Sequence, residues 1–232
     1  VLLISVASTR PNSGASATNT LTIKPGVGVN ASFTGTSASA LITLNGADWV
    51  TIDGANTIGG TTRNLSFQNT NAGVTSAVLW GQSIGANDPA TNNTIKNLNV
   101  AGNSSITTLI GIGFGSSTIG TGSLGSRNDN NRFQNNAVTA TQFGIYSQGA
   151  SSLVKNVGTV VTGNTLGGAG ALAISRAGIV VGFDDGTQVT DNTISGIGPT
   201  STGGFVDAIG IALGSFSISN TAFSTNNDVA NV

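Results

Sequence analysis

The aspartates of the segment GFDDG are the strongest candidates for chemistry in this chain. Asp184 and Asp185 are adjacent, and Asp191 follows on the next short segment. Paired carboxylates can act as acid and base in glycoside hydrolysis. The same oxygens could contribute to a calcium site, which needs six to eight ligands. Because Asp and Gly also favour turns, we predict a solvated turn here, with no catalytic residue, cofactor or metal ligand. Structural calcium at Asp184 and Asp185 is the open alternative.

The serines, glycine-rich stretches and aromatic residues do not indicate a catalytic or phosphate-binding site. The chain has no His and no Cys, so no His is present to activate a serine. Glycine-rich stretches such as GIGFG lie within strand-like repeats and do not open a helix, as a phosphate-binding loop must. Among the aromatic residues, Trp49 would be a contact residue if exposed, although packing beneath a loop is favoured. Trp80 and Tyr146 occupy equivalent repeat positions, which favours stacking along the repeat over a sugar platform.

Composition and charge exclude several classes of partner. Eight Lys and Arg residues are scattered along 232 residues, and the net charge is -1. Nucleic-acid binding relies instead on clustered cations. No stretch reaches the roughly 18 apolar residues of a membrane span. Gly, Asn, Ser and Thr belong in turns and strands more than in helix interiors, and the 38% of hydrophobic residues recur in short runs. We therefore predict a nearly all-β protein with no nucleic-acid partner and no membrane span.

A repeat of strand-like segments organises the chain from Leu65 to Phe223. The segments LSFQN, TIKN, RFQN, VVTGN, QVTDN and SISN each place an apolar residue two positions before Asn, Asp or Gly. The apolar residues, spaced 28, 38, 28, 28 and 29 residues apart, are Phe67, Ile95, Phe133, Val161, Val189 and Ile218. The residues two positions later are Asn69, Asn97, Asn135, Gly163, Asp191 and Asn220. Because these types adopt left-handed backbone at low cost, we predict a sharp bend at each. A further apolar column follows at Val100, Val138, Leu166, Ile194 and Phe223.

A second series is interleaved with the first. The segments AVLWG, LIGIG, FGIYS, AGIVVG and AIGIALG centre on Leu79, Ile112, Ile145, Ile179 and Ile211, spaced 33, 33, 34 and 32 residues apart. Each unit therefore contributes at least two strands at nearly fixed offsets. The Gly- and Ser-rich stretch from Gly115 to Asp129 is expected to be the longest loop.

Repeats of this period indicate stacked units rather than one folded-back core. We predict an all-β parallel β-helix of roughly seven coils, with asparagine side chains forming ladders along the axis. Residues 1–20 are expected to hold an N-terminal strand, Val1 to Ala7, and a turn region that could cap the first coil. The β-helix is expected over residues 21–223. Residues 224–232 are expected to form a tail that continues into further chain or stacks against another copy.

Several phrases resemble a known family. LITLNGADWVTIDG, RNLSFQNTN, NNTIKNLNV, DNNRFQNN, FGIYSQG, GNTLG and GTQVTDNTISGI are similar to large bacterial secreted or cell-surface β-helix repeat proteins, within the pectate-lyase-like superfamily. The resemblance covers about Leu21 to Gly214 and implies a right-handed helix, export from the cell and no assigned reaction. Hydrolases of the superfamily also carry His, which is absent here, and its lyases pair an Arg base with carboxylate-bound calcium. Arg176 has no matching acidic cluster in the sequence, and Trp49 stands where the family pattern has a polar residue or Tyr.

The expected function follows from repetition without concentrated chemistry. We predict a non-enzymatic extracellular structural or adhesive module of a larger surface protein or filament, with self-association through the β-helix ends. The alternative is a polysaccharide-binding or polysaccharide-cleaving protein with Trp49, Trp80, Asp184 and Asp185 along its site. A weaker third hypothesis is an ice- or mineral-binding face made of threonine rows.

Overall fold

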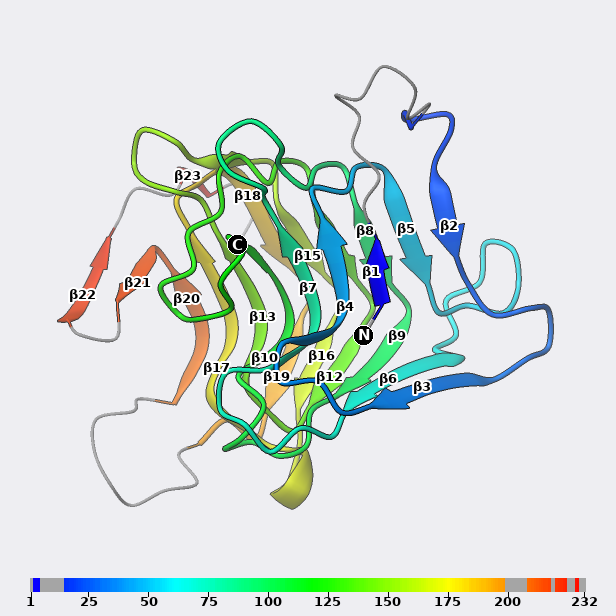
Figure 1. The fold of residues 1–232 in the computed structure, drawn as a ribbon. Helices are drawn as coiled ribbons and strands as arrows, with labels where there is room; N and C mark the ends of the chain where they lie inside the picture. The colour runs from blue at the N-terminus through cyan, green and yellow to red at the C-terminus, as the bar shows by residue number, and fades with distance from the viewer. Residues whose placement is uncertain (1, 5–14, 199–207, 218–219, 225–227, 230–232) are drawn as a thin grey trace.

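The chain folds as a three-sheet parallel β-helix, seen in a computed structural model (Figure 1). The structure describes residues 2–4, 15–198, 208–217, 220–224 and 228–229. Strands visit the three sheets in a fixed order, and each strand pairs in parallel with its equivalents in the neighbouring coils. The predicted all-β parallel β-helix is confirmed. The right hand and the number of roughly seven coils stay predictions.

Sheet A has seven strands: β1 (Leu2–Ile4), β4 (Ala40–Asn45), β7 (Ala77–Gln82), β10 (Ile110–Gly115), β13 (Thr141–Gln148), β17 (Ile174–Gly182) and β20 (Ile209–Leu213). Sheet B has eight: β2 (Leu21–Ile23), β5 (Val50–Asp53), β8 (Thr94–Lys96), β11 (Arg132–Gln134), β15 (Val160–Thr162), β18 (Asp184–Thr190), β14 (Asn156–Val157) and β23 (Asp228–Val229). Sheet C has six: β3 (Ala31–Gly35), β6 (Leu65–Asn69), β9 (Leu98–Ala101), β12 (Ala137–Thr139), β16 (Thr165–Gly167) and β19 (Thr193–Ser195).

Two short strands and one 3-10 turn lie outside this pattern. Strands β21 (Ser215–Ser217) and β22 (Asn220–Ser224) form an antiparallel pair. A single 3-10 turn, Gly170–Leu172, is the helical segment of the described chain, and no helix there is long and apolar enough to cross a bilayer.

The second predicted series is confirmed residue by residue. Its five members pair in register along sheet A, and the row continues to Ile42 on β4 and Leu2 on β1. The predicted N-terminal strand is therefore part of sheet A over Leu2–Ile4, and the rest of Val1 to Ala7 lies outside the described residues. The long loop after Gly115 is also present, because no strand occurs between β10 and β11.

The first series is confirmed at its four central members. Ile95, Phe133, Val161 and Val189 pair in one row of sheet B, whose earlier member is Ile52 on β5. Phe67 was assigned wrongly, because it pairs with Phe33 and Val100 in sheet C. The sheet C row then continues through Val138, Leu166 and Ile194, as predicted. Phe223 does not join it, because β22 pairs only with β21 among the described strands. Ile218 lies outside the described residues.

The bends between sheets B and C have the predicted geometry. Asn97, Asn135, Gly163 and Asp191 have positive φ values of 58°, 48°, 65° and 56°. Asn69 does not belong to this column, since it ends β6 in sheet C with a buried side chain. Asn220 begins β22 and is not a bend of the helix. The bend prediction is therefore confirmed at four of its positions and wrong at these two.

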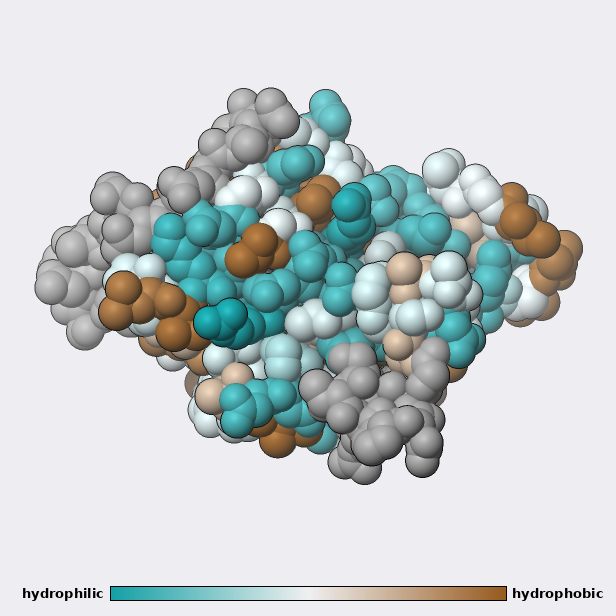
Figure 2. Space-filling model, turned by 90° about the horizontal axis from the view of Figure 1, so that it is seen from above, coloured by the Kyte–Doolittle hydropathy of each residue, from teal (hydrophilic) through white to brown (hydrophobic). Residues whose placement is uncertain are grey.

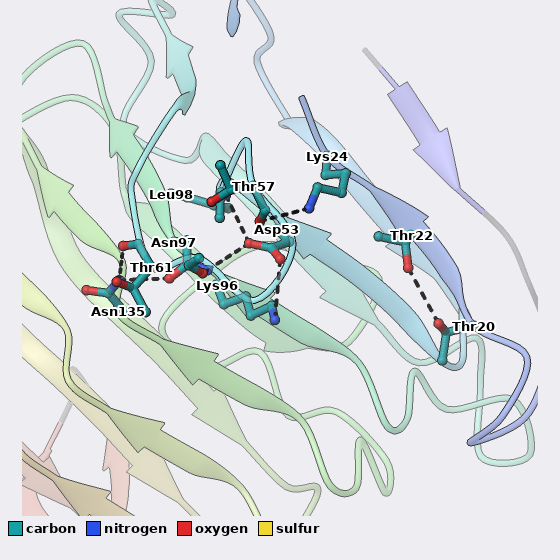
Figure 3. A network of polar contacts seen from close by, with 12 residues as sticks. Thr20, Thr22, Lys24, Asp53, Thr57, Thr61, Lys96, Asn97, Leu98 and Asn135 are labelled. Atoms are coloured by element: carbon teal, nitrogen blue, oxygen red, sulfur yellow. Dashed lines mark hydrogen bonds and ion pairs between the residues drawn. The ribbon is translucent and has the colours of Figure 1, made fainter. Parts of the chain in front are cut away.

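Amide ladders run along the axis, as predicted. At the B–C bends, Asn135 Nδ2 donates to Asn97 Oδ1 at 2.7 Å, and Asn97 Nδ2 donates to the Asp53 carboxylate at 2.7 Å. Lys96 closes this ladder by pairing with Asp53 at 3.4 Å (Figure 3). Burial acts to raise the pKa of Asp53, but the hydrogen bonds from Asn97 and Ala55 and the charge of Lys96 hold that pKa below its usual value.

A second ladder lies inside the helix. Asn136, Asn164 and Asn192 stack one coil apart, and the first two are almost fully buried. The amide oxygens of Asn164 and Asn192 accept the backbone N–H of the preceding member, at 2.9 Å from Asn136 and 3.0 Å from Asn164. Because unpartnered buried polar groups are costly, these hydrogen bonds tie each coil to the next while the apolar rows fill the remaining interior.

Candidate functional site

The GFDDG segment is not the solvated turn that the sequence predicted. Asp184 and Asp185 begin strand β18, and their side chains lie on opposite faces of it. Asp184 is fully buried, where its carboxylate accepts hydrogen bonds from the hydroxyl and the backbone N–H of Thr159. Asp185 is half exposed and pairs with Lys155 at 3.3 Å. The prediction fails at Asp184 because the strand of the preceding coil continues through this position, pairing Asn156 with Asp184.

Asp184 is an unusual interior residue. Desolvation raises its pKa, although hydrogen bonds from Thr159 oppose that shift. Asp129 lies close enough for the charge of Asp184 to help raise its own pKa, behind the larger effect of burial. Asp129 Oδ1 accepts the backbone N–H of Val157 at 2.9 Å. These carboxylates are thus held by coil-to-coil hydrogen bonds.

The other predicted chemical partners lie elsewhere. Asp191 is the bend residue just beyond the far end of β18, whose seven residues extend roughly 20 Å at 3.3 Å per residue. Arg176 lies on β17 in sheet A, where its guanidinium stacks 5.2 Å from the centroid of the Phe143 ring. Within the described part of the chain, no group of three or more acidic residues is arranged to hold a metal ion. The calcium alternative at Asp184 and Asp185 gains no support, because their carboxylates lie on opposite faces of the strand.

Trp80 and Tyr146 stack along the outer face of sheet A, as predicted. Their ring centroids are 6.1 Å apart, and both side chains are fully buried. The covering loop, residues 116–131, lies over them. Trp80 Nε1 donates to Ser116 O at 3.0 Å, and the Tyr146 hydroxyl donates to Thr121 O at 3.0 Å. Neither aromatic ring is available as a sugar platform in this arrangement.

Trp49 lies at a bend between sheets A and B. Its backbone N–H donates to Thr91 O, and its carbonyl accepts from Leu21, each at 3.1 Å. The side chain is half-buried, between the two outcomes considered from the sequence. Its φ is 59°, in the left-handed region that the sequence did not predict for this position.

A shallow groove crosses the outer face of sheet C, with a volume of about 260 Å³. It runs across β3, β6, β9 and β12, and its lining carries no charged side chain. The lining residues are Ser32, Thr34, Ser66, Phe67, Gln68, Asn99, Val100, Ala101, Ala137 and Thr139. Ala101 and Ala137 keep the floor low, while hydroxyl and amide groups surround it. Sequence reasoning did not single out this groove, because its residues come together only through the register of four strands.

A guanidinium lies beside this groove. Arg63 Nη2 donates to Thr165 Oγ1 at 3.3 Å, and Thr165 follows Ala137 in the same outward row. Arg63 also donates to Asn135, through Nε to the backbone oxygen and through Nη2 to the side-chain oxygen, both at 2.8 Å. Burial lowers the pKa of Arg63. The arrangement offers uncharged hydrogen-bonding groups and one cation, which suits recognition rather than proton transfer.

No protein-family model, curated protein or solved structure matches this chain.

Proposed function

We propose that this chain is a non-enzymatic structural or adhesive module of a larger extracellular or cell-surface protein, of the bacterial β-helix repeat family that its motifs resemble. The observation that carries the proposal is one row of sheet A that stays in register from Leu2 on β1 to Ile211 on β20. Hydrogen-bonded parallel strands link every neighbouring pair of coils along this row, and the internal amide ladder of Asn136, Asn164 and Asn192 adds side-chain bonds between three of these coils. Such a stack is suited to spacing or displaying other parts of a protein.

The state of the acidic residues supports a non-enzymatic role. Asp184 points into the interior and Asp185 is paired with Lys155, so the two carboxylates do not face a common substrate position. The test is incubation of the purified chain with pectin, alginate, xylan and chitin, followed by measurement of released reducing ends. No product is expected. Release of sugars that disappears in an Asp185→Asn variant would overturn the proposal.

Self-association through the ends belongs to the same proposal. Strands β2 and β3 each pair on one side only among the described strands. Leu21 and Phe33, on these strands, are 42% and 43% exposed. Unpaired edges with apolar side chains favour addition of another strand. Light scattering should show concentration-dependent association, which Phe33→Lys should weaken. A chain that stays monomeric at high concentration would contradict this part.

Polysaccharide binding is the second candidate, and the groove on sheet C favours it. The groove is lined by hydroxyl and amide groups, which can exchange hydrogen bonds with sugar hydroxyls. Figure 2 shows one face of the molecule as mostly hydrophilic or neutral, with separate apolar spots. Glycan binding that weakens in Gln68→Ala, with an unchanged unfolding midpoint, would support this function. Binding indifferent to that change would exclude the groove.

A further inference from the structure

A second column of left-handed residues lies in the strands of sheet B or just before them. Trp49, Asn92, Asn130, Gly158 and Gly186 follow one another through the strand register, with φ values of 59°, 56°, 56°, 69° and 70°. Asn and Gly adopt this backbone region at low cost, whereas a bulky side chain incurs steric strain there. Trp49 is the one bulky residue in this column, and Phe183, at the bend between β17 and β18, is a second aromatic residue with positive φ, at 47°.

The interior does not account for the tryptophan. Its side chain is only half-buried, unlike that of Trp80, which is fully buried. The Trp80 indole N–H donates to Ser116 O, whereas the Trp49 indole N–H meets no acceptor among the described residues. A strained position occupied by a partly exposed aromatic ring is a reason to look for a role in contact.

The surroundings of Trp49 indicate the chemistry of that contact. Its neighbours in the column are Thr20 on one side and Asn92 on the other, both uncharged. Two residues further along, Thr51 lies in an outward row between Thr22 and Thr94. Successive members of this row are about 4.8 Å apart, the spacing between neighbouring strands. An aromatic side chain two positions before a row of hydroxyl groups suits a sugar ring, which presents apolar C–H groups on its face and hydroxyls at its edge.

We propose that Trp49 is a stacking platform for a ring of a neutral glycan, with the threonine row of β2, β5 and β8 as its hydrogen-bonding flank. The site lies on sheet B and its bend to sheet A, so it is separate from the groove on sheet C. The inference deepens the polysaccharide-binding candidate above and rests on it.

The test combines binding with stability. The chain is titrated with gluco-, xylo- and manno-oligosaccharides, and tryptophan fluorescence is recorded. Because Trp80 is buried, a response reports on Trp49. At least one of these neutral oligosaccharides should bind the parent chain. Trp49→Asn restores the residue type of its neighbour in the column. It should therefore weaken binding about tenfold, measured by calorimetry, and keep an unfolding midpoint at or above that of the parent.

Two further variants control the test. Trp49→Phe keeps an aromatic face at the same strained position and should retain most of the binding. Asn92→Gly alters the adjacent member of the column and should leave binding unchanged. If Trp49→Asn lowers the unfolding midpoint, the ring is there for packing and the proposal is overturned.

The remaining outcomes separate this inference from the function on which it rests. Binding that survives Trp49→Asn but is lost in Gln68→Ala would refute the stacking role and leave the groove as the glycan site. Failure of every neutral oligosaccharide to bind would overturn both the stacking role and the polysaccharide-binding candidate. The structural proposal would then remain.

Discussion

Replacing Asn164 with Leu tests whether the internal amide ladder holds the coils together. Asn164 is 1% exposed, and its side-chain oxygen accepts from both the backbone N–H and Nδ2 of Asn136, at 2.9 and 3.1 Å. Its Nδ2 donates to Phe133 O and to Asn192 Oδ1, both at 2.9 Å. Leucine has a similar size but makes none of these bonds.

The magnitude follows from the partners that are left behind. The backbone N–H of Asn136 loses its acceptor inside the helix, which costs about 1–3 kcal/mol. The Asn136 amide keeps its bond to Ile95 O, and Asn192 Oδ1 keeps the backbone N–H of residue 164. The Asn136 amide and Asn192 Oδ1 thus each lose one hydrogen bond and keep another, and together they add roughly 1 kcal/mol to the loss of stability. We therefore expect a loss of about 2–4 kcal/mol in the free energy of unfolding.

Urea unfolding followed by far-ultraviolet circular dichroism measures the total loss. Hydrogen exchange then localises it, because a solenoid's stability is close to a sum over neighbouring repeats. Protection should fall in β12 and β16, which carry the broken contacts, and stay unchanged in β4. Asn103→Ala is the control, since this exposed asparagine should change stability by less than about 0.5 kcal/mol. Equal stabilities of the two variants would refute the role of the ladder.

Three further changes test other parts of the structure. Asp184→Asn should stabilise the chain at pH 7. Burial raises the folded-state pKa of Asp184 above its unfolded value, so the stability that the protonated Asp184 provides is lost as pH rises through the folded pKa, whereas asparagine stays neutral. Unfolding measured at pH 7 and again near the unfolded pKa of about 3.9 should show this advantage shrinking, and a pH-independent difference would contradict it. Asn135→Val should cost about 1–3 kcal/mol in thermal or urea unfolding through strain at φ 48° and the lost amide contacts, and a variant as stable as the parent would refute the bend assignment. Tyr146→Phe removes the hydrogen bonds from the tyrosine hydroxyl to Thr121 and Ser123, which should destabilise the covering loop by about 1 kcal/mol. The loop should then be cleaved faster by a protease while the coils stay intact. An unchanged rate of cleavage would show that these two bonds do not anchor the loop.

Much of the architecture could be predicted because one residue type recurs where one geometry recurs. The Gly-Ile dipeptides of sheet A could be aligned from the sequence. Strands of this sheet are five to nine residues long from β4 onward, so each one carries enough of the pattern to be recognised. Phe67 could not be placed, because LSFQN and RFQN look alike while joining different sheets. The segment between β5 and β6 is long, so Phe67 falls in sheet C and not in sheet B, and the residues around Phe67 do not reveal that length.

The interior ladders carried a signal in the sequence that the turn-like composition concealed. Asn136, Asn164 and Asn192 are 28 residues apart, and so are Asn128, Asn156 and Asp184. That period matches the spacing of Phe133, Val161 and Val189, so it could have shown that Asp184 continues a buried column. Reading GFDDG in isolation gave a turn, because Asp and Gly favour turns wherever burial does not intervene.

In a chain whose asparagines serve backbone geometry and coil-to-coil hydrogen bonds, the informative residues are those that depart from their columns. Asp184 places an ionisable group where earlier coils have Asn128 and Asn156, and the Thr159 hydroxyl compensates for it inside the protein. Trp49 places a large ring where later coils have Asn or Gly, and no described group takes up its indole N–H. The first departure is satisfied within the fold, whereas the second leaves an aromatic ring partly open to solvent. The outer corner at Trp49 is therefore where contact with another molecule is best sought.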